Sequence, residues 1–168
     1  PHFVTTGSAI LLNDNIISEI EKIKIYVSLE NLFSLKKMKV KNIVIEEANF
    51  NFNKKNYNFF VRLLDSNFNN IKLEIVNSNI FYRNLENNVL FINKILDAKY
   101  IYDFNESKNI LYFNNEIFNL PYSIKLFKNK DEKKLYTKIE IDSLRLQAEN
   151  QFSYDGDFIF GLSEFNIL

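Results

Sequence analysis

The sequence predicts a mainly β protein built on an antiparallel sheet, and three observations lead to this fold class. Apolar and polar residues alternate through most of the chain, which is the period of a strand with one buried face. Stretches rich in Asn, Asp and Lys separate these segments at spacings near the roughly 8 to 12 residues typical of antiparallel β architecture. Helical periodicity is confined to two short segments. Roughly ten strand segments are therefore expected.

The first half of the chain carries the clearest alternation. Residues 20–29, IEKIKIYVSL, place an apolar side chain at every second position. The same period returns around Val40, at 43–45 and at 50–52, but the apolar parity changes between these segments. Each change predicts a bulge or a turn, because a slip by one residue would otherwise move the apolar side chains to the other face.

The second half of the chain also consists of strand segments separated by turn-prone segments. Turns are expected at Asn84–Asn88, Asn105–Asn109, Lys128–Lys134 and Asp155–Asp157. Pro121 lacks a backbone N–H, so its strand should be at an edge, bulged or interrupted there. The strand segments expected in this half span residues 71–75, 80–82, 89–102, 110–113, 122–127 and 135–146. The last stretch, 152–168, begins with the turn at Asp155–Asp157 and ends in an apolar run.

Two segments have helical spacing instead. Leu32 and Leu35 lie three residues apart within 31–35, which is enough for one helical turn. Residues 58–64 place three apolar side chains on one helical face, after an Asn that can cap the helix. One or two short helices between strands are therefore expected.

Composition excludes several classes of function. The chain has 168 residues, which indicates one domain, and 21 basic against 21 acidic side chains, which argues against a nucleic-acid partner. It contains no Cys, so iron–sulfur and structural zinc sites are excluded, and its three Gly cannot form the common phosphate-binding loops. His2 is the one imidazole and lies at the start of the chain. No catalytic residues, no metal and no cofactor are expected.

The aromatic content leaves two architectures open. Seventeen Phe and nine Tyr on strands normally belong to a core. One open sheet of ten strands would be about 48 Å wide and would need a cover for its apolar face. Either the sheet closes into a barrel or sandwich, or it curls into a trough whose apolar interior is covered by a ligand.

Several segments, in their order and spacing, resemble the AsmA family of bacterial envelope proteins. The resemblance covers residues 20 to about 150. In chain order its segments are IEKIKIYVSLENLFSLKKMKVKNIVIEEANFNF (20–52), NYNFFVRLL (56–64), LEIVNSNIFYR (73–83), VLFINKI (89–95) and NNEIFNLPYSIKLF (114–127).

The resemblance implies a curled antiparallel sheet that forms a taco-like open groove, similar to that of bridge-like lipid transfer proteins. It further implies an inner-membrane anchor outside this segment, a periplasmic location for the segment, and a role in phospholipid transport and outer-membrane biogenesis. Residues 1–168 would then be a single groove segment of a longer membrane-anchored protein.

The function expected is therefore non-enzymatic binding or transfer of phospholipid through its acyl chains. The alternative is a closed β-sandwich or barrel that serves as a scaffold or as an assembly factor for outer-membrane proteins. The alternating residues expected to line the lipid groove are Ile23, Ile25, Val27, Ile71, Leu73, Ile75, Ile139 and Ile141.

Overall fold

The computed structural model describes residues 1–28, 39–56, 71–129, 132, 134–155 and 158–167. Within these ranges the chain forms one ten-stranded sheet and a single short 3-10 turn, η3 (Asp142–Leu144). The strands are β1 (His2–Leu12), β2 (Asn15–Val27), β3 (Val40–Phe52), β4 (Lys72–Arg83), β5 (Val89–Asp103), β6 (Lys108–Ile117), β7 (Leu120–Asn129), β8 (Lys134–Ile141), β9 (Leu146–Asp155) and β10 (Phe158–Ile167).

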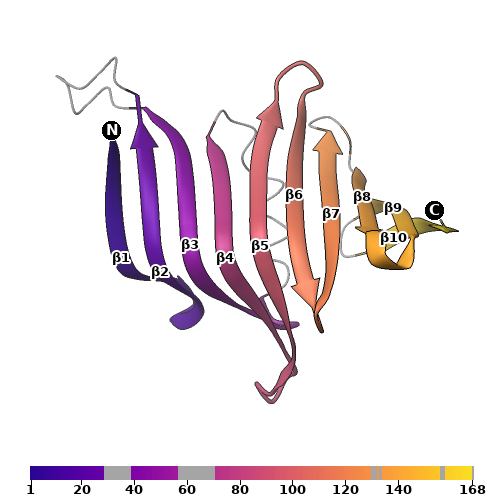
Figure 1. The fold of residues 1–168 in the computed structure, drawn as a ribbon, viewed down its shortest axis with the longest axis horizontal. Helices are drawn as coiled ribbons and strands as arrows, with labels where there is room; N and C mark the ends of the chain where they lie inside the picture. Colours follow the sequence, from indigo (N-terminus) through magenta and orange to yellow (C-terminus); the bar gives the residue numbers. More distant parts are fainter. Residues whose placement is uncertain (29–38, 57–70, 130–131, 133, 156–157, 168) are drawn as a thin grey trace.

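The strands lie side by side in chain order, from β1 at one edge to β10 at the other (Figure 1). The sheet twists along its width, so that β8 to β10 are viewed almost edge-on while β1 to β7 face the viewer. Because β1 and β10 do not pair with each other, the sheet is open. The expected mainly β, open architecture is therefore confirmed, and the closed barrel or sandwich is wrong.

One pair of neighbours departs from the antiparallel pattern. β3 and β4 run parallel, with Ile45 opposite Ile75 and Phe50 opposite Ile80. All other neighbouring strands are antiparallel. A parallel pair needs a connection that returns to the starting end of the sheet, and the chain between β3 and β4 is correspondingly long. Both predicted helices, at 31–35 and 58–64, lie outside the described residues.

A line of backbone irregularities crosses the first strands at one level. Gly7 on β1, Glu47 on β3 and Asn77 on β4 all have positive φ, at 62°, 56° and 49°. The pairing skips these residues, and on β5 it shifts register between Ile95 and Asp97. The shift within β3 is the bulge that the change of parity after residue 45 predicts. Because the bulges are aligned, apolar side chains stay on the same face above and below the line.

The core lies on that face. Its buried cluster consists of Ile20, Ile45, Ala48, Phe50, Ile95 and Ala98, and partly buried side chains from β1 to β4 and from β6 pack against it. The side chains of the buried cluster come from β2, β3 and β5, so the first half of the sheet holds the best-packed region.

The expected turns at Asn84–Asn88 and Asn105–Asn109 are found, whereas those at Lys128–Lys134 and Asp155–Asp157 lie partly outside the described residues. Two strand predictions are wrong. β1 was not expected, because TTGSA in its centre interrupts the apolar alternation. The single strand expected at 135–146 is two strands, since η3 and Arg145 in the left-handed conformation turn the chain between β8 and β9. Pro121 is the second residue of β7 and lies before the first pair with β8, where no ladder donor is needed.

Candidate functional site

The register of the sheet brings apolar side chains into one continuous row. In a sheet, directly paired residues point to the same face, so the pairing can be followed from strand to strand. Starting at β1, the paired residues are Thr5, Ile23, Ile45, Ile75, Ala98, Phe113, Ile124, Ile139, Ala148 and Phe165. We refer to these ten residues as the apolar row. All but Thr5 are apolar.

A second row on the same face lies two residues along each strand. It consists of Phe3, Ile25, Ile43, Leu73, Tyr100, Leu111, Leu126, Thr137, Asn150 and Ser163. Its members are apolar or aromatic from β1 to β7 and polar from β8 to β10. The apolar face therefore spans both rows from β2 to β7 and narrows to one row over the last three strands.

The opposite face is charged. The row between the two apolar rows contains Lys24, Glu74, Lys99, Lys125, Lys138, Glu149 and Glu164. Glu46 on this face bonds Lys24 and lies 3.3 Å from the Nζ atom of Lys22. The hydrogen bond from Lys24 lowers the pKa of the Glu46 carboxyl, although partial desolvation opposes the shift. The sheet is thus amphipathic, with water on the charged face.

Seven of the eight residues predicted to line a lipid groove fall on the apolar side of their strands. Ile23, Ile75 and Ile139 belong to the apolar row, and Ile25 and Leu73 belong to the row beside it. Val27 and Ile141 continue the same alternation on β2 and β8, whereas Ile71 precedes β4 and is half-buried.

Sequence reasoning missed the residues that join these segments. Ile45, Ala98, Phe113 and Ile124 connect Ile23 on β2 to Ile139 on β8. The alternation of Ile124 and Leu126 with polar neighbours was a usable signal. Ala98 gave none, because its importance comes from its position between larger side chains.

The exposure of the apolar row varies along the sheet. Ile45 and Ala98 are buried, whereas Phe113, Ile124 and Ile139 are only half-buried. At the edge, Phe165 on β10 is 79% exposed. The row is therefore buried on β3 and β5, half-buried on β2, β4 and β6 to β9, and exposed on the edge strands β1 and β10.

Tyr100 is the one phenol in the second row, and burial raises its pKa to about 12 from the ordinary value of 10. A side-chain hydrogen bond with Asn109 lowers the pKa of Tyr100, but by less than burial raises it. The unfolded chain releases this proton near pH 10 and the folded chain near pH 12. The stabilising contribution of the neutral phenol is thus complete below pH 10 and is lost as the pH rises to 12.

We therefore expect the free energy of unfolding to fall more steeply between pH 10 and 12 in the wild type than in Tyr100→Phe. Urea denaturation at a series of pH values measures both slopes. The other tyrosines are common to the two proteins and cancel in the comparison. Equal slopes would show that Tyr100 titrates in the folded protein as it does in water.

Within the described ranges, no group of three or more His, Asp or Glu side chains is placed to hold a metal ion. The same part of the chain contains no helix long and apolar enough to cross a membrane. The fold and its surface thus define an amphipathic protein made of one open sheet. No protein-family model and no curated protein sequence matches the chain.

Proposed function

We propose that this chain is a non-enzymatic lipid-binding segment that holds phospholipid acyl chains against its apolar face. The observation that carries the proposal is the apolar row, whose apolar members run from β2 to β10 of an open sheet. Where the row is half-buried, on β2, β4 and β6 to β9, apolar surface remains available to a ligand. Burial of each CH2 group of an acyl chain contributes about 0.8 kcal/mol.

The arrangement also suits movement of the lipid. Ile, Leu and Phe side chains make non-directional contacts, so an acyl chain can shift along the row without breaking hydrogen bonds. The face opposite the apolar row is charged and remains in contact with water. In this proposal the segment works in the bacterial periplasm, as part of a longer AsmA-like protein anchored in the inner membrane, and serves phospholipid transport to the outer membrane.

Photo-crosslinking at two adjacent positions tests the proposal. A benzophenone amino acid at Leu73 should capture phospholipid in cells, whereas the same group at Lys72 should not. The two residues are neighbours on β4 but point to opposite faces, so Lys72 controls for proximity to the membrane. Capture at both positions, or at neither, contradicts the groove.

A scaffold or assembly factor for outer-membrane proteins is the second candidate. It is favoured by the buried cluster around Ile95 and Ala98, because a part of the apolar face is already packed against protein. Native mass spectrometry after mild extraction separates the two functions. Phospholipid that copurifies with the chain supports lipid binding, and bare protein supports the scaffold.

A further inference from the structure

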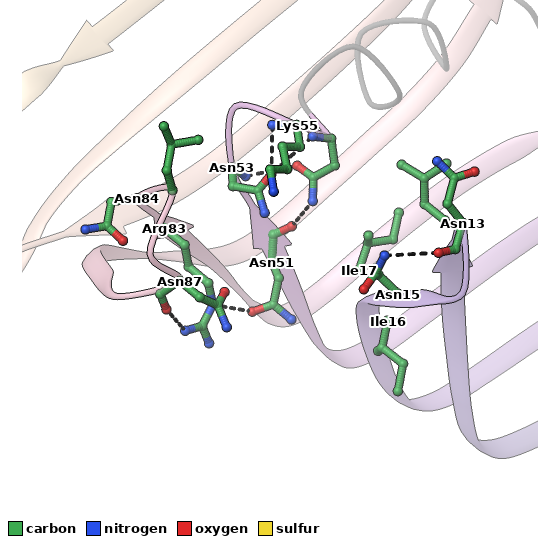
Figure 2. A pocket seen from close by; sticks show the side chains of 13 residues that line it. Asn13, Asn15, Ile16, Ile17, Asn51, Asn53, Lys55, Arg83, Asn84 and Asn87 are labelled. Carbon is green, nitrogen blue, oxygen red and sulfur yellow. Dashed lines mark hydrogen bonds between the residues drawn. The ribbon is translucent and has the colours of Figure 1, made fainter.

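A polar pocket lies at one end of the sheet, away from the apolar row. The β1–β2 turn, the end of β3 and the β4–β5 turn surround a cavity of about 470 Å³ (Figure 2). Its described lining contains two cations, Arg83 and Lys55, several Asn residues, four Leu and Ile residues and no carboxylate. Asp14 and Glu86 lie on the adjacent turns but are not part of the lining. The pocket is thus a concentration of positive charge on a chain with zero net charge.

Arg83 is held in a defined orientation. Its Nε atom donates to Oδ1 of Asn51 at 2.8 Å, and its Nη1 atom donates to the backbone carbonyl of Asn87 at 2.9 Å (Figure 2). The ring of Phe81 lies 5.7 Å from the guanidinium carbon. A guanidinium has five N–H groups, so about three of them remain for a ligand once these two bonds are made. No carboxylate among the described residues forms an ion pair with Arg83.

The wall that carries Lys55 is also fixed. Asn56 is 4% exposed, and its Nδ2 atom donates to the carbonyl of Asn51 at 2.6 Å. Its Oδ1 atom accepts a bond from the Asn53 amide, while Oδ1 of Asn53 accepts bonds from the amides of Lys55 and Asn56. These bonds hold the turn after β3, so Lys55 is placed in the wall of the same cavity that Arg83 lines.

We propose that this pocket binds a phosphate group. An oriented guanidinium suits phosphate because two of its N–H groups can contact two phosphate oxygens, while the ammonium of Lys55 adds a second positive charge. Two cations match the charge of a phosphate dianion. The phosphate belongs either to a lipid headgroup or to a soluble phosphate ester. Arg83 and Asn51 belong to the charged face of the sheet, so this site does not depend on lipid binding at the apolar row.

Calorimetric titration of the purified chain with inorganic phosphate tests the site. Arg83→Gln should weaken binding about tenfold or more, which is the effect of losing a charge-assisted hydrogen bond, and Lys55→Gln a few-fold. Lys125→Gln is the matched control, because Lys125 is a cation of β7 that lies over Tyr112 and outside the pocket. Binding that is equal in the wild type and Arg83→Gln overturns the proposal.

Arg83 also bonds two neighbouring segments, so a second measurement guards against misfolding of the variant. In the wild type, the 15N resonance of the Arg83 Nε group should shift during the phosphate titration, and the absence of a shift overturns the proposal. Arg83→Lys keeps the positive charge but loses the planar guanidinium that can contact two phosphate oxygens. This variant should therefore bind phosphate with intermediate affinity. Vesicles of phosphatidic acid in phosphatidylcholine that compete with phosphate identify a headgroup. If they do not compete, the ligand is a soluble phosphate ester.

Discussion

Replacing Ile95 with Ala is expected to lower the free energy of unfolding by about 3 kcal/mol. Ile95 is 1% exposed and is among the largest fully buried side chains of the described sheet. It lies on β5 opposite Ser78 of β4 and Asn115 of β6, within the buried cluster. Truncation removes buried CH2 and CH3 groups and leaves a cavity that the paired strands cannot close. Urea denaturation followed by circular dichroism measures the change.

Ile92 provides the matched control on the same strand. It is the same residue type, three positions earlier, but it is 47% exposed and lies opposite Phe81 on the charged face. Ile92→Ala should cost less than about 1 kcal/mol. If the two substitutions destabilise the protein equally, the core is not on the face assigned to it.

Replacing Ser78 with Ala should cost about 2 kcal/mol, although only one oxygen atom is removed. Ser78 is fully buried beside the aligned bulges, where the pairing between β3 and β4 is interrupted. Its Oγ atom accepts a bond from the Ala48 amide at 3.0 Å and donates to the Val76 carbonyl at 2.9 Å. The hydroxyl thus replaces a missing ladder bond, and its removal leaves a buried N–H without an acceptor.

Ser123→Ala is the control for this second substitution. Ser123 lies in the regular part of β7, on the charged face between Asn114 and Glu140, and is only half-buried. Removal of the Ser123 hydroxyl should change the free energy of unfolding by less than about 0.5 kcal/mol. Amide hydrogen exchange gives a second readout, since the Ala48 amide should exchange faster in Ser78→Ala alone. Unchanged protection of Ala48 would contradict the role assigned to the hydroxyl.

The aligned bulges keep the apolar surface, on which the proposed function depends, on one face of the sheet. If Gly7, Glu47 and Asn77 were ordinary extended residues, each strand would reverse its faces halfway along its length. Ile45 and Phe50 on β3 could not then share a face, and the apolar surface would be broken into two halves. Three positive-φ residues at one level therefore keep the apolar surface on a single side of the sheet.

Much of the fold could be predicted from the sequence, because alternation is a local property. Ile23 and Ile25, or Leu73 and Ile75, share a face whenever their segment is extended, whatever the strand pairs with. Residues such as Asn84 and Asn87 mark turns through their own backbone preferences. Strand β1 escaped prediction because its side chains are mostly exposed and its small polar centre carries no periodic signal.

By itself, the sequence determined the strand-rich class of this protein, several of its turns, the parity changes that mark bulges, and which predicted groove residues share a face within one strand. Only the tertiary structure decided that the sheet stays open, that β3 and β4 run parallel, and that Ala98 and Phe113 join Ile23 to Ile139 in one row. It also brought Lys55 and Arg83 to one pocket from different strand ends. The physical reason is that alternation acts within a strand, whereas order and register depend on pairing between residues far apart in the chain.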